Sequence, residues 1–251
     1  MSYLKSPQGG RLVKTKRIAI VSDIHANIYA LNAFLEYLKK HFQVTDILNL
    51  GDFLQIGPYP REVTEIIFSD KRFINILGNN ELSLLDRNPS SFPEDEYAHQ
   101  DWTIKQIGPE LIGKLSQISK SNILSINEKK LLMIHSRPYN TIEMPLLYQG
   151  KPLDDFKKDY DSMDVDYVLF GHTHLQAYIN YWGNKTFINP GSLGCSKESI
   201  MSFCLAEIDS QDISFSFKNI HYDNSKLKDD YIRLGVPAAK RILSLFYGIK
   251  I

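Results

Sequence analysis

The sequence predicts an α/β fold, a sandwich with helices and a mixed β-sheet. In the first third of the chain, short apolar segments alternate with segments of helical periodicity, and the last third holds consecutive strand-like segments. This order favours a sandwich with a mixed sheet. The first strand, Ile18–Val21, is apolar throughout, which indicates burial on both of its faces.

Apolar spacing places the other elements. After the first strand, a helix ends near Lys39-Lys40, and Pro60 begins a second helix at its first turn. Residues 86–96 read as a loop, with helical stretches at 102–107 and 111–118. Further strands are expected at 47–50, 73–77, 131–134, 167–170, 185–188, 202–208 and 213–220, and a closing helix at 237–247.

The chain has 251 residues, of which 43% are hydrophobic and 23% charged, the balance of an ordinary globular protein. We expect one domain over residues 17–251, preceded by a flexible polar arm at 1–16. An acidic, irregular stretch at 154–166 is the best candidate for an insertion or a lid.

Several function classes are disfavoured. The 29 basic and 29 acidic residues cancel, so general nucleic-acid binding is not expected. No signal sequence and no membrane-spanning apolar run is evident, which predicts a cytoplasmic protein. Cys195 and Cys204 are then expected as free thiols. Motifs of kinases, dehydrogenases, zincins and serine hydrolases are absent.

Five expected strands are each followed by a residue that can bind a metal. These residues are Asp23 and His25, Asp52, Asn79, His135, and His172 and His174. Ligands bind outside the carboxyl ends of strands in open α/β sheets, so parallel neighbours would bring these side chains to one site.

The donor set consists of two carboxylates, four imidazoles and an amide oxygen. Such donors suit manganese, iron, zinc, nickel or cobalt. Seven donors are more than the four that a single tetrahedral zinc ion binds, but they fit two ions that share a carboxylate. Asp52 can be this shared ligand, because its two oxygens can each bind one ion. Two such ions would activate a bridging hydroxide for phosphoryl displacement.

The ordered motifs resemble the calcineurin-like metallophosphoesterase superfamily. They are Asp23-Ile24-His25, Gly51-Asp52, Gly78-Asn79-Asn80-Glu81, His135 and Gly171-His172-Thr173-His174, followed by Asn189-Pro190-Gly191-Ser192. The resemblance implies a four-layer α/β/β/α sandwich with two mixed sheets. It also implies one divalent ion on Asp23, His25, Asp52 and His174 and a second on Asp52, Asn79, His135 and His172, with manganese preferred.

Taken singly, these residues have ordinary alternatives. Asp23 could cap the following helix, Asp52 could belong to a turn, and His135 could be a core histidine. His172 and His174 would point to opposite faces of a continued strand, so they share a site only if Gly171 starts a turn. The ordered set favours the metal site.

One position departs from the family pattern. Many members carry histidine after the motif asparagine, where it can protonate the leaving oxygen, and this chain has Asn80. An amide is no general acid, which favours substrates with good leaving groups, such as phosphodiesters and phosphoanhydrides. His99 could supply the proton instead, and Arg137 could clamp a phosphate oxygen.

The sequence therefore predicts a dinuclear metal-dependent phosphodiesterase that acts on a small phosphorylated, nucleotide-like substrate. The alternatives are a phosphomonoesterase or protein phosphatase, and a non-catalytic scaffold of the same fold. Phe92, Tyr97 and Trp102 could line a pocket for a base, although aromatic residues near helices more often join the core.

Overall fold

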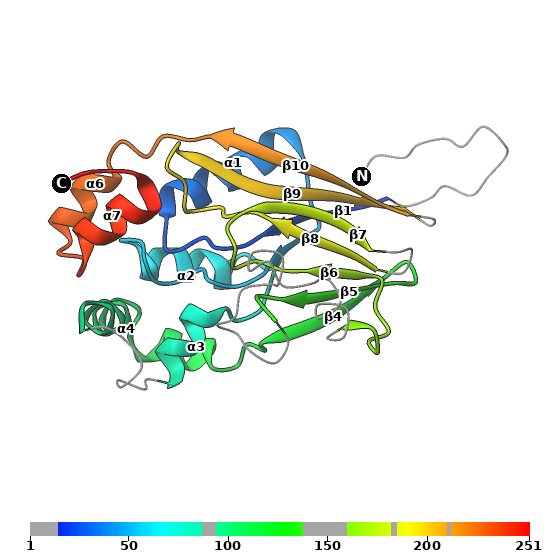
Figure 1. Ribbon diagram of the computed structural model, residues 1–251, viewed down its shortest axis with the longest axis horizontal. Coiled ribbons are helices and arrows are strands. Elements are labelled where there is room, and N and C mark those ends of the chain that lie inside the picture. Colours follow the sequence, from blue (N-terminus) through cyan, green and yellow to red (C-terminus); the bar gives the residue numbers. More distant parts are fainter. Residues whose placement is uncertain (1–14, 87–93, 138–159, 182–184, 210–211) are drawn as a thin grey trace, which may run out of the picture.

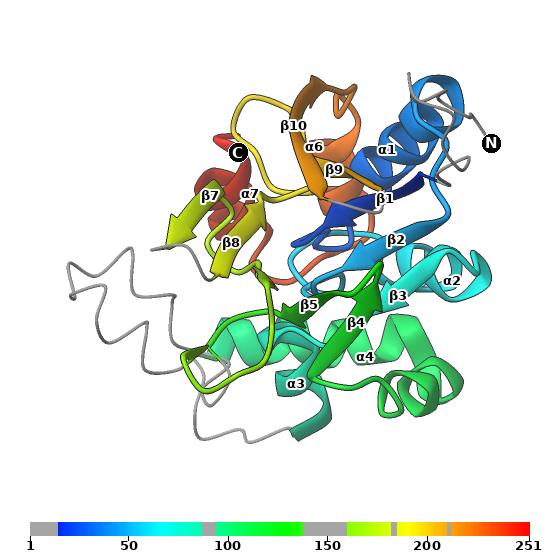
Figure 2. The same ribbon diagram turned by 90° about the vertical axis from the view of Figure 1, so that its right-hand side faces the viewer.

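The computed structural model describes residues 15–86, 94–137, 160–181, 185–209 and 212–251. In this part of the chain, two five-stranded sheets pack face to face and helices surround them (Figures 1 and 2). The strand order is β10-β9-β1-β2-β3 in the first sheet and β4-β5-β6-β8-β7 in the second. The strands are β1 (Lys16–Val21), β2 (Asp46–Asn49), β3 (Phe73–Asn75), β4 (Ser121–Ile126), β5 (Lys129–Ile134), β6 (Tyr167–Leu169), β7 (Gln176–Tyr181), β8 (Lys185–Pro190), β9 (Ile200–Ile208) and β10 (Ile213–His221).

Both sheets are mixed. In the first sheet β1, β2 and β3 are parallel, and β9 runs antiparallel to β1 and β10. In the second sheet β5, β6 and β8 are parallel, and β4 and β7 are antiparallel edge strands. The predicted α/β sandwich with two mixed sheets is therefore confirmed.

The strand β1 is buried on both faces, as its apolar sequence predicts. Ala19 and Val21 pack toward helices, whereas Ile18 and Ile20 pack between the two sheets.

The helices are α1 (Ile28–His41), α2 (Pro60–Ser69), α3 (Asn79–Asp86), α4 (Glu94–Leu115), α6 (Leu227–Arg233) and α7 (Ala239–Tyr247). Pro60 is the first residue of α2, and the side chain of Asn27 caps α1 by accepting from the Ala30 N–H.

The two predicted helical stretches after residue 96 lie on one helix, α4, which is interrupted in its middle. Gly108 has φ 74° and ψ 170°, and Pro109 follows it. Helices do not continue through such a backbone, because proline has no N–H and glycine here adopts a conformation that other residues avoid. The expectation of two helical segments is therefore correct, but they are joined by a kink at Gly108 and Pro109 and not by a loop.

Four elements have no counterpart in the sequence prediction. The edge strands β4 and β7 carry few consecutive apolar residues, α3 coincides with a ligand motif, and α6 buries only a few side chains. Weak periodicity is typical of edge strands and short helices, whose burial is decided by their neighbours.

The C-terminal helices form their own small core. Leu227 and Tyr231 of α6 pack against Leu243 and Tyr247 of α7. Figure 1 shows α6 and α7 (orange to red) at the left end of the molecule, the same end as α4. No helix among the described residues is both long and apolar enough to cross a bilayer. Phe92, nearly all of the predicted arm at 1–16 and the first half of the stretch 154–166 lie outside the described residues.

Candidate metal centre

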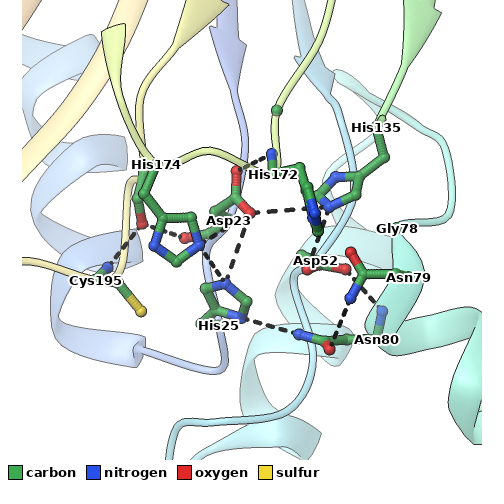
Figure 3. Close-up of polar contacts among 12 residues, drawn as sticks. Asp23, His25, Asp52, Gly78, Asn79, Asn80, His135, His172, His174 and Cys195 are labelled. Atoms are coloured by element: carbon green, nitrogen blue, oxygen red, sulfur yellow. Dashed lines mark hydrogen bonds and ion pairs between the residues drawn. The ribbon is translucent and has the colours of Figure 1, made fainter. Parts of the chain in front are cut away.

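Loops at the carboxyl ends of the parallel strands carry all the predicted ligands. Strands β1, β2 and β3 of the first sheet lead into Asp23 and His25, Asp52 and Asn79. Strands β5 and β6 of the second sheet lead into His135, His172 and His174. Because the sheets stack with these ends together, the seven side chains converge on one place (Figure 3).

A left-handed backbone aims several of these side chains inward. The φ angles are 55° at Asp23, 50° at His25, 53° at Asp52, 68° at His172 and 60° at His174. A positive φ is unusual for residues other than glycine and costs on the order of 1–3 kcal/mol, so such residues gather at functional sites. Both His172 and His174 face the site because β6 has ended before Gly171.

Two glycines allow the loops to approach each other closely. A Cβ atom on Gly78 would lie 2.1 Å from Asp52 Oδ1, and one on Gly171 would lie 1.9 Å from Ser22 Oγ. Neither position has room for a side chain, so the glycines of the two motifs are required by packing at the site.

The ligand atoms form two clusters. In the first, His174 Nε2 lies 3.0 Å from His25 Nε2 and 3.2 Å from Asp23 Oδ1. In the second, His135 Nε2 lies 3.2 Å from Asp52 Oδ2, and one ligand atom each of Asp52, His135 and His172 lies within 4.8 Å of the others. Asp52 is also within this distance of Asp23 and His25, so it belongs to both clusters.

Buried atoms without hydrogen-bond partners test whether these residues fit metal ions. Among the described residues, Asp23 Oδ1, Asn79 Oδ1 and His135 Nε2 are buried and make no hydrogen bond. An unsatisfied buried polar atom is costly, and three at one site indicate a missing partner. Carboxylate, amide and imidazole donors fit divalent transition-metal ions.

Hydrogen bonds behind the ligands hold them in place. His135 Nδ1 donates to the Leu50 carbonyl at 2.8 Å, so its Nε2 faces the site. Asp23 Oδ2 accepts from the His172 N–H, and Asp52 Oδ1 accepts from the Asn80 N–H.

The buried Glu81 supports the loop that carries Asp52. Its carboxylate accepts from the backbone N–H groups of Asp52, Leu54 and Gly78, each at 2.8 Å. Glu81 thereby joins the loops after β2 and β3. Its role is structural, as its place in the motif suggests.

The electrostatics favour a bound cation. Burial opposes ionisation of Asp23, but His174 and His25 hold its pKa well below the usual value. Burial also opposes protonation of His135, yet the negative charge of Asp52 raises its pKa to about 10. These shifts reflect a site rich in negative charge, and a divalent ion bound there would displace a proton from His135.

Asn80 and His99 lie beside the metal centre around a cavity of about 150 Å³. We call it the α7 cavity; its lining includes Ile56, Asn80, His99, Arg241, Ile242 and Phe246. The amide Nδ2 of Asn80 is 3.4 Å from His25 Nδ1. Burial lowers the pKa of His99 to about 4, and its Nε2 lies 3.3 Å from the Ile56 carbonyl. A neutral imidazole is a weak proton donor at neutral pH.

Arg137 follows β5 and lines a separate hollow together with His135 and Ser136. It is thus near the second cluster, as expected from its position two residues after His135. Its proposed role as a phosphate clamp stays a prediction.

Two residues at the site were not anticipated from the sequence. Cys195 Sγ and a ring nitrogen of each of His25 and His174 lie within 4.8 Å of one another. Both Cys195 and Cys204 are free, as expected, and burial raises the pKa of each thiol. The second is Phe246, whose ring centroid is 6.4 Å from that of His25 and 6.1 Å from that of His174.

The local sequence gives only a weak signal for either residue. Cys195 follows the Asn189–Ser192 motif, and Phe246 is one of several apolar residues of the closing helix. Trp102, considered for a base pocket, packs instead against the C-terminal core and the ring of His99.

The family model for the calcineurin-like phosphoesterase superfamily domain matches residues 17–211. The match covers most of the chain and every predicted metal ligand, so this protein belongs to that superfamily. The α6 and α7 helices lie outside the matched region.

Individual proteins are similar to this chain in sequence or in fold. An uncharacterized protein of Methanocaldococcus jannaschii, MJ0912, is 27% identical over 237 residues, with 88% of this chain and 93% of that protein covered. The crystal structure of the hypothetical protein PH1004 from Pyrococcus horikoshii OT3 has a TM-score of 0.78 at 19% identity and covers 94% of this chain and 99% of that one. A metallophosphoesterase structure from Sphaerobacter thermophilus has a TM-score of 0.69 at 23% identity and covers 90% and 98%. At these identities the two structures show a shared fold.

Proposed function

We propose that this protein is a dinuclear metal-dependent phosphoesterase that hydrolyses phosphodiesters or phosphoanhydrides in preference to alkyl phosphomonoesters. The observation that carries the proposal is the convergence of seven ligand side chains, with Asp52 in both clusters and three buried ligand atoms without partners. A scaffold has no need for such a set.

The ligands divide between two ions. Asp23, His25, Asp52 and His174 would hold the first, and Asp52, Asn79, His135 and His172 the second. When bound, two such ions supply an activated nucleophile and stabilise charge on the phosphoryl oxygens. Manganese is our first choice, with iron, zinc, nickel and cobalt as alternatives.

The residues around the metal centre explain the expected preference. Asn80 can orient a leaving oxygen through its amide but cannot protonate it. His99 is held neutral by burial and faces the Ile56 carbonyl. Neither group is suited to protonate a poor alkoxide leaving group. The lack of a general acid should therefore slow hydrolysis least for substrates whose leaving group departs as a stable anion. Arg137 would contact the phosphoryl group from the side of His135.

A side-by-side assay of two substrates tests the proposal. The protein is stripped of metal and reloaded with Mn²⁺, and hydrolysis of bis(p-nitrophenyl) phosphate is compared with that of p-nitrophenyl phosphate. Faster cleavage of the diester that needs Mn²⁺ and is lost in Asp52→Asn is the expected result.

Other outcomes point elsewhere. A preference for the monoester would contradict the assignment of Asn80 and favour a phosphomonoesterase with another proton donor. If neither substrate is turned over and the purified protein contains no metal, the scaffold alternative is favoured. We also propose, from the sequence alone, that the substrate is a small phosphorylated molecule and that the protein is cytoplasmic.

A further inference from the structure

The α7 cavity adjoins the metal centre, and its apolar wall has no role in the chemistry proposed above. It shares Asn80 with the site, and the ring of Phe246 lies close to two metal-ligand imidazoles. The cavity is therefore adjacent to the place where the proposed metals would hold a phosphoryl group.

One face of α7 forms a wall of the cavity. Arg241 and Leu245 lie one helical turn apart, as do Ile242 and Phe246, so these four side chains share a face. Leu243 and Tyr247 are turned into the core with α6, to which Ile242 also belongs and against which Phe246 packs. Ile242 and Phe246 therefore serve both this core and the cavity wall, whereas Leu245 lines the cavity without being part of the core.

Core packing leaves part of the cavity face uncovered. Leu245 is 56% exposed although it is large and apolar, and Phe246 is only partly buried. Exposed apolar groups that line a concave surface beside polar groups are typical of ligand sites.

The size and lining of the cavity suit a flat ring. A cavity of about 150 Å³ is known to hold one benzene molecule, whereas drug-sized ligands need roughly 300–1,000 Å³. Ile56, Ile242 and Phe246 offer apolar surface, while Gln55, Glu96 and Arg241 offer hydrogen-bonding groups. A single aromatic ring with polar substituents at its edge matches this combination.

We propose that the α7 cavity binds a flat aromatic ring carried by an ester group of the substrate, and that Phe246 is the residue on which this ring packs. This inference rests on the proposed function, because the ring is positioned by a phosphoryl group on the metals. The ring could belong to an aryl ester or to a pyrimidine nucleotide, which offer the same chemistry. The substrate class would then be an aromatic phosphodiester, selected by a helix outside the matched phosphoesterase region.

Binding of non-hydrolysable and product-like probes tests the inference without turnover. Isothermal titration calorimetry on the Mn²⁺-loaded protein compares phenylphosphonate with methylphosphonate, and uridine 5′-monophosphate with ribose 5-phosphate. Stacking of a base on an aromatic side chain is worth about 5- to 150-fold in affinity, so the aromatic member of at least one pair should bind about tenfold more tightly. The pair with the larger difference identifies an aryl or a nucleoside substrate.

Variants assign the effect to Phe246. Phe246→Ala should reduce the aromatic preference to less than about threefold and leave the affinity of methylphosphonate or ribose 5-phosphate unchanged. Phe246→Leu keeps apolar volume and should also lose preference, whereas Phe246→Tyr should retain it. Ile232→Ala, on an exposed position of α6, is the control and should behave as the wild-type protein.

The outcomes separate this inference from the proposed function. Aromatic preference without hydrolysis would contradict the proposed function and support the cavity assignment. Hydrolysis with equal affinity for both members of each pair would overturn the cavity assignment alone. A preference that survives in Phe246→Ala, or no binding of any probe to the metal-loaded protein, would also overturn it.

Discussion

The metal side and the α7 side of the site differ in how they are built. On the metal side, Asp23, His25 and Asp52 have exposed fractions of 0%, 1% and 3% and stand on strained loops between strands and helices. On the α7 side, Leu245 is 56% exposed and Arg241 is half-exposed in an ion pair with Asp95. The metal side is carried by loops of both sheets, whereas most of the apolar wall of the α7 side comes from one short helix, α7.

This difference in construction suggests that the metal side determines turnover and the α7 side determines substrate selectivity. A metal site tolerates little displacement of its ligands, because coordination distances and angles are narrow. A cavity wall on a peripheral helix can change its side chains without disturbing the sheets. Variants on the metal side should therefore affect turnover, and variants on the α7 side should affect which substrate is bound.

The largest effects are expected from removal of single ligands. His174→Ala removes a ligand from the first cluster and His172→Ala one from the second. Each should lower the metal content from about two ions per chain to about one, and hydrolysis by at least about 100-fold. Metal content is measured by mass spectrometry after dialysis. A single ion per chain in the wild-type protein, or full activity in either variant, would contradict the dinuclear assignment.

A gain of function is expected where the two sides meet. Asn80→His introduces a possible general acid next to His25, and general acid catalysis is worth about 10²–10⁴-fold. Hydrolysis of glycerol 2-phosphate, whose alkoxide leaving group needs a proton, should rise by about 100-fold relative to the aryl diester. Asn80→Gln keeps the amide and should show no such gain. An unchanged ratio in Asn80→His would mean that proton supply does not limit the reaction.

The hydrogen bonds of Glu81 behind the metal side should contribute to the free energy of unfolding. Glu81→Gln replaces one acceptor oxygen with a donor in front of backbone N–H groups, so at least one N–H loses its partner. The free energy of unfolding should fall by about 1–3 kcal/mol in urea at pH 7. Glu65→Gln, on the exposed surface of α2, should change it by less than about 0.5 kcal/mol. Equal stability of the two variants would refute the structural role of Glu81.

The smallest effect concerns His99 on the α7 side. Because burial lowers its pKa from 6.5 to about 4, the unfolded chain takes up a proton below pH 6.5 that the folded protein does not accept. The stability contributed by neutral His99 is present above pH 6.5 and is lost as the pH falls toward 4. Between pH 7.5 and pH 5 this loss is about 2 kcal/mol. In His99→Gln the metal-free protein should lose correspondingly less stability over that range. Parallel profiles of unfolding free energy for the two proteins would show that His99 is not held neutral.

The amino-acid sequence by itself determined the fold class and the set of residues in the candidate metal site. Metal ligands must be particular residue types, and parallel strands place them at one edge of a sheet, so their order after Ile18–Val21, Ile47–Leu50 and the later strands is informative. Buried strands and long amphipathic helices were equally legible, because their apolar periodicity is strong. The weakly patterned elements β4, β7 and α6 were not, because neighbouring elements decide their burial.

Only the tertiary structure decided how these residues act together. His172 and His174 share a site because left-handed backbone at both turns them inward, which a two-residue spacing alone does not imply. Asp52 stands between the clusters because Glu81 and Gly78 hold its loop against the next strand. Phe246 reaches the site from the far end of the chain because α6 and α7 pack beside the metal loops. Contacts between residues so distant in sequence depend on packing, and no local pattern of residues encodes them.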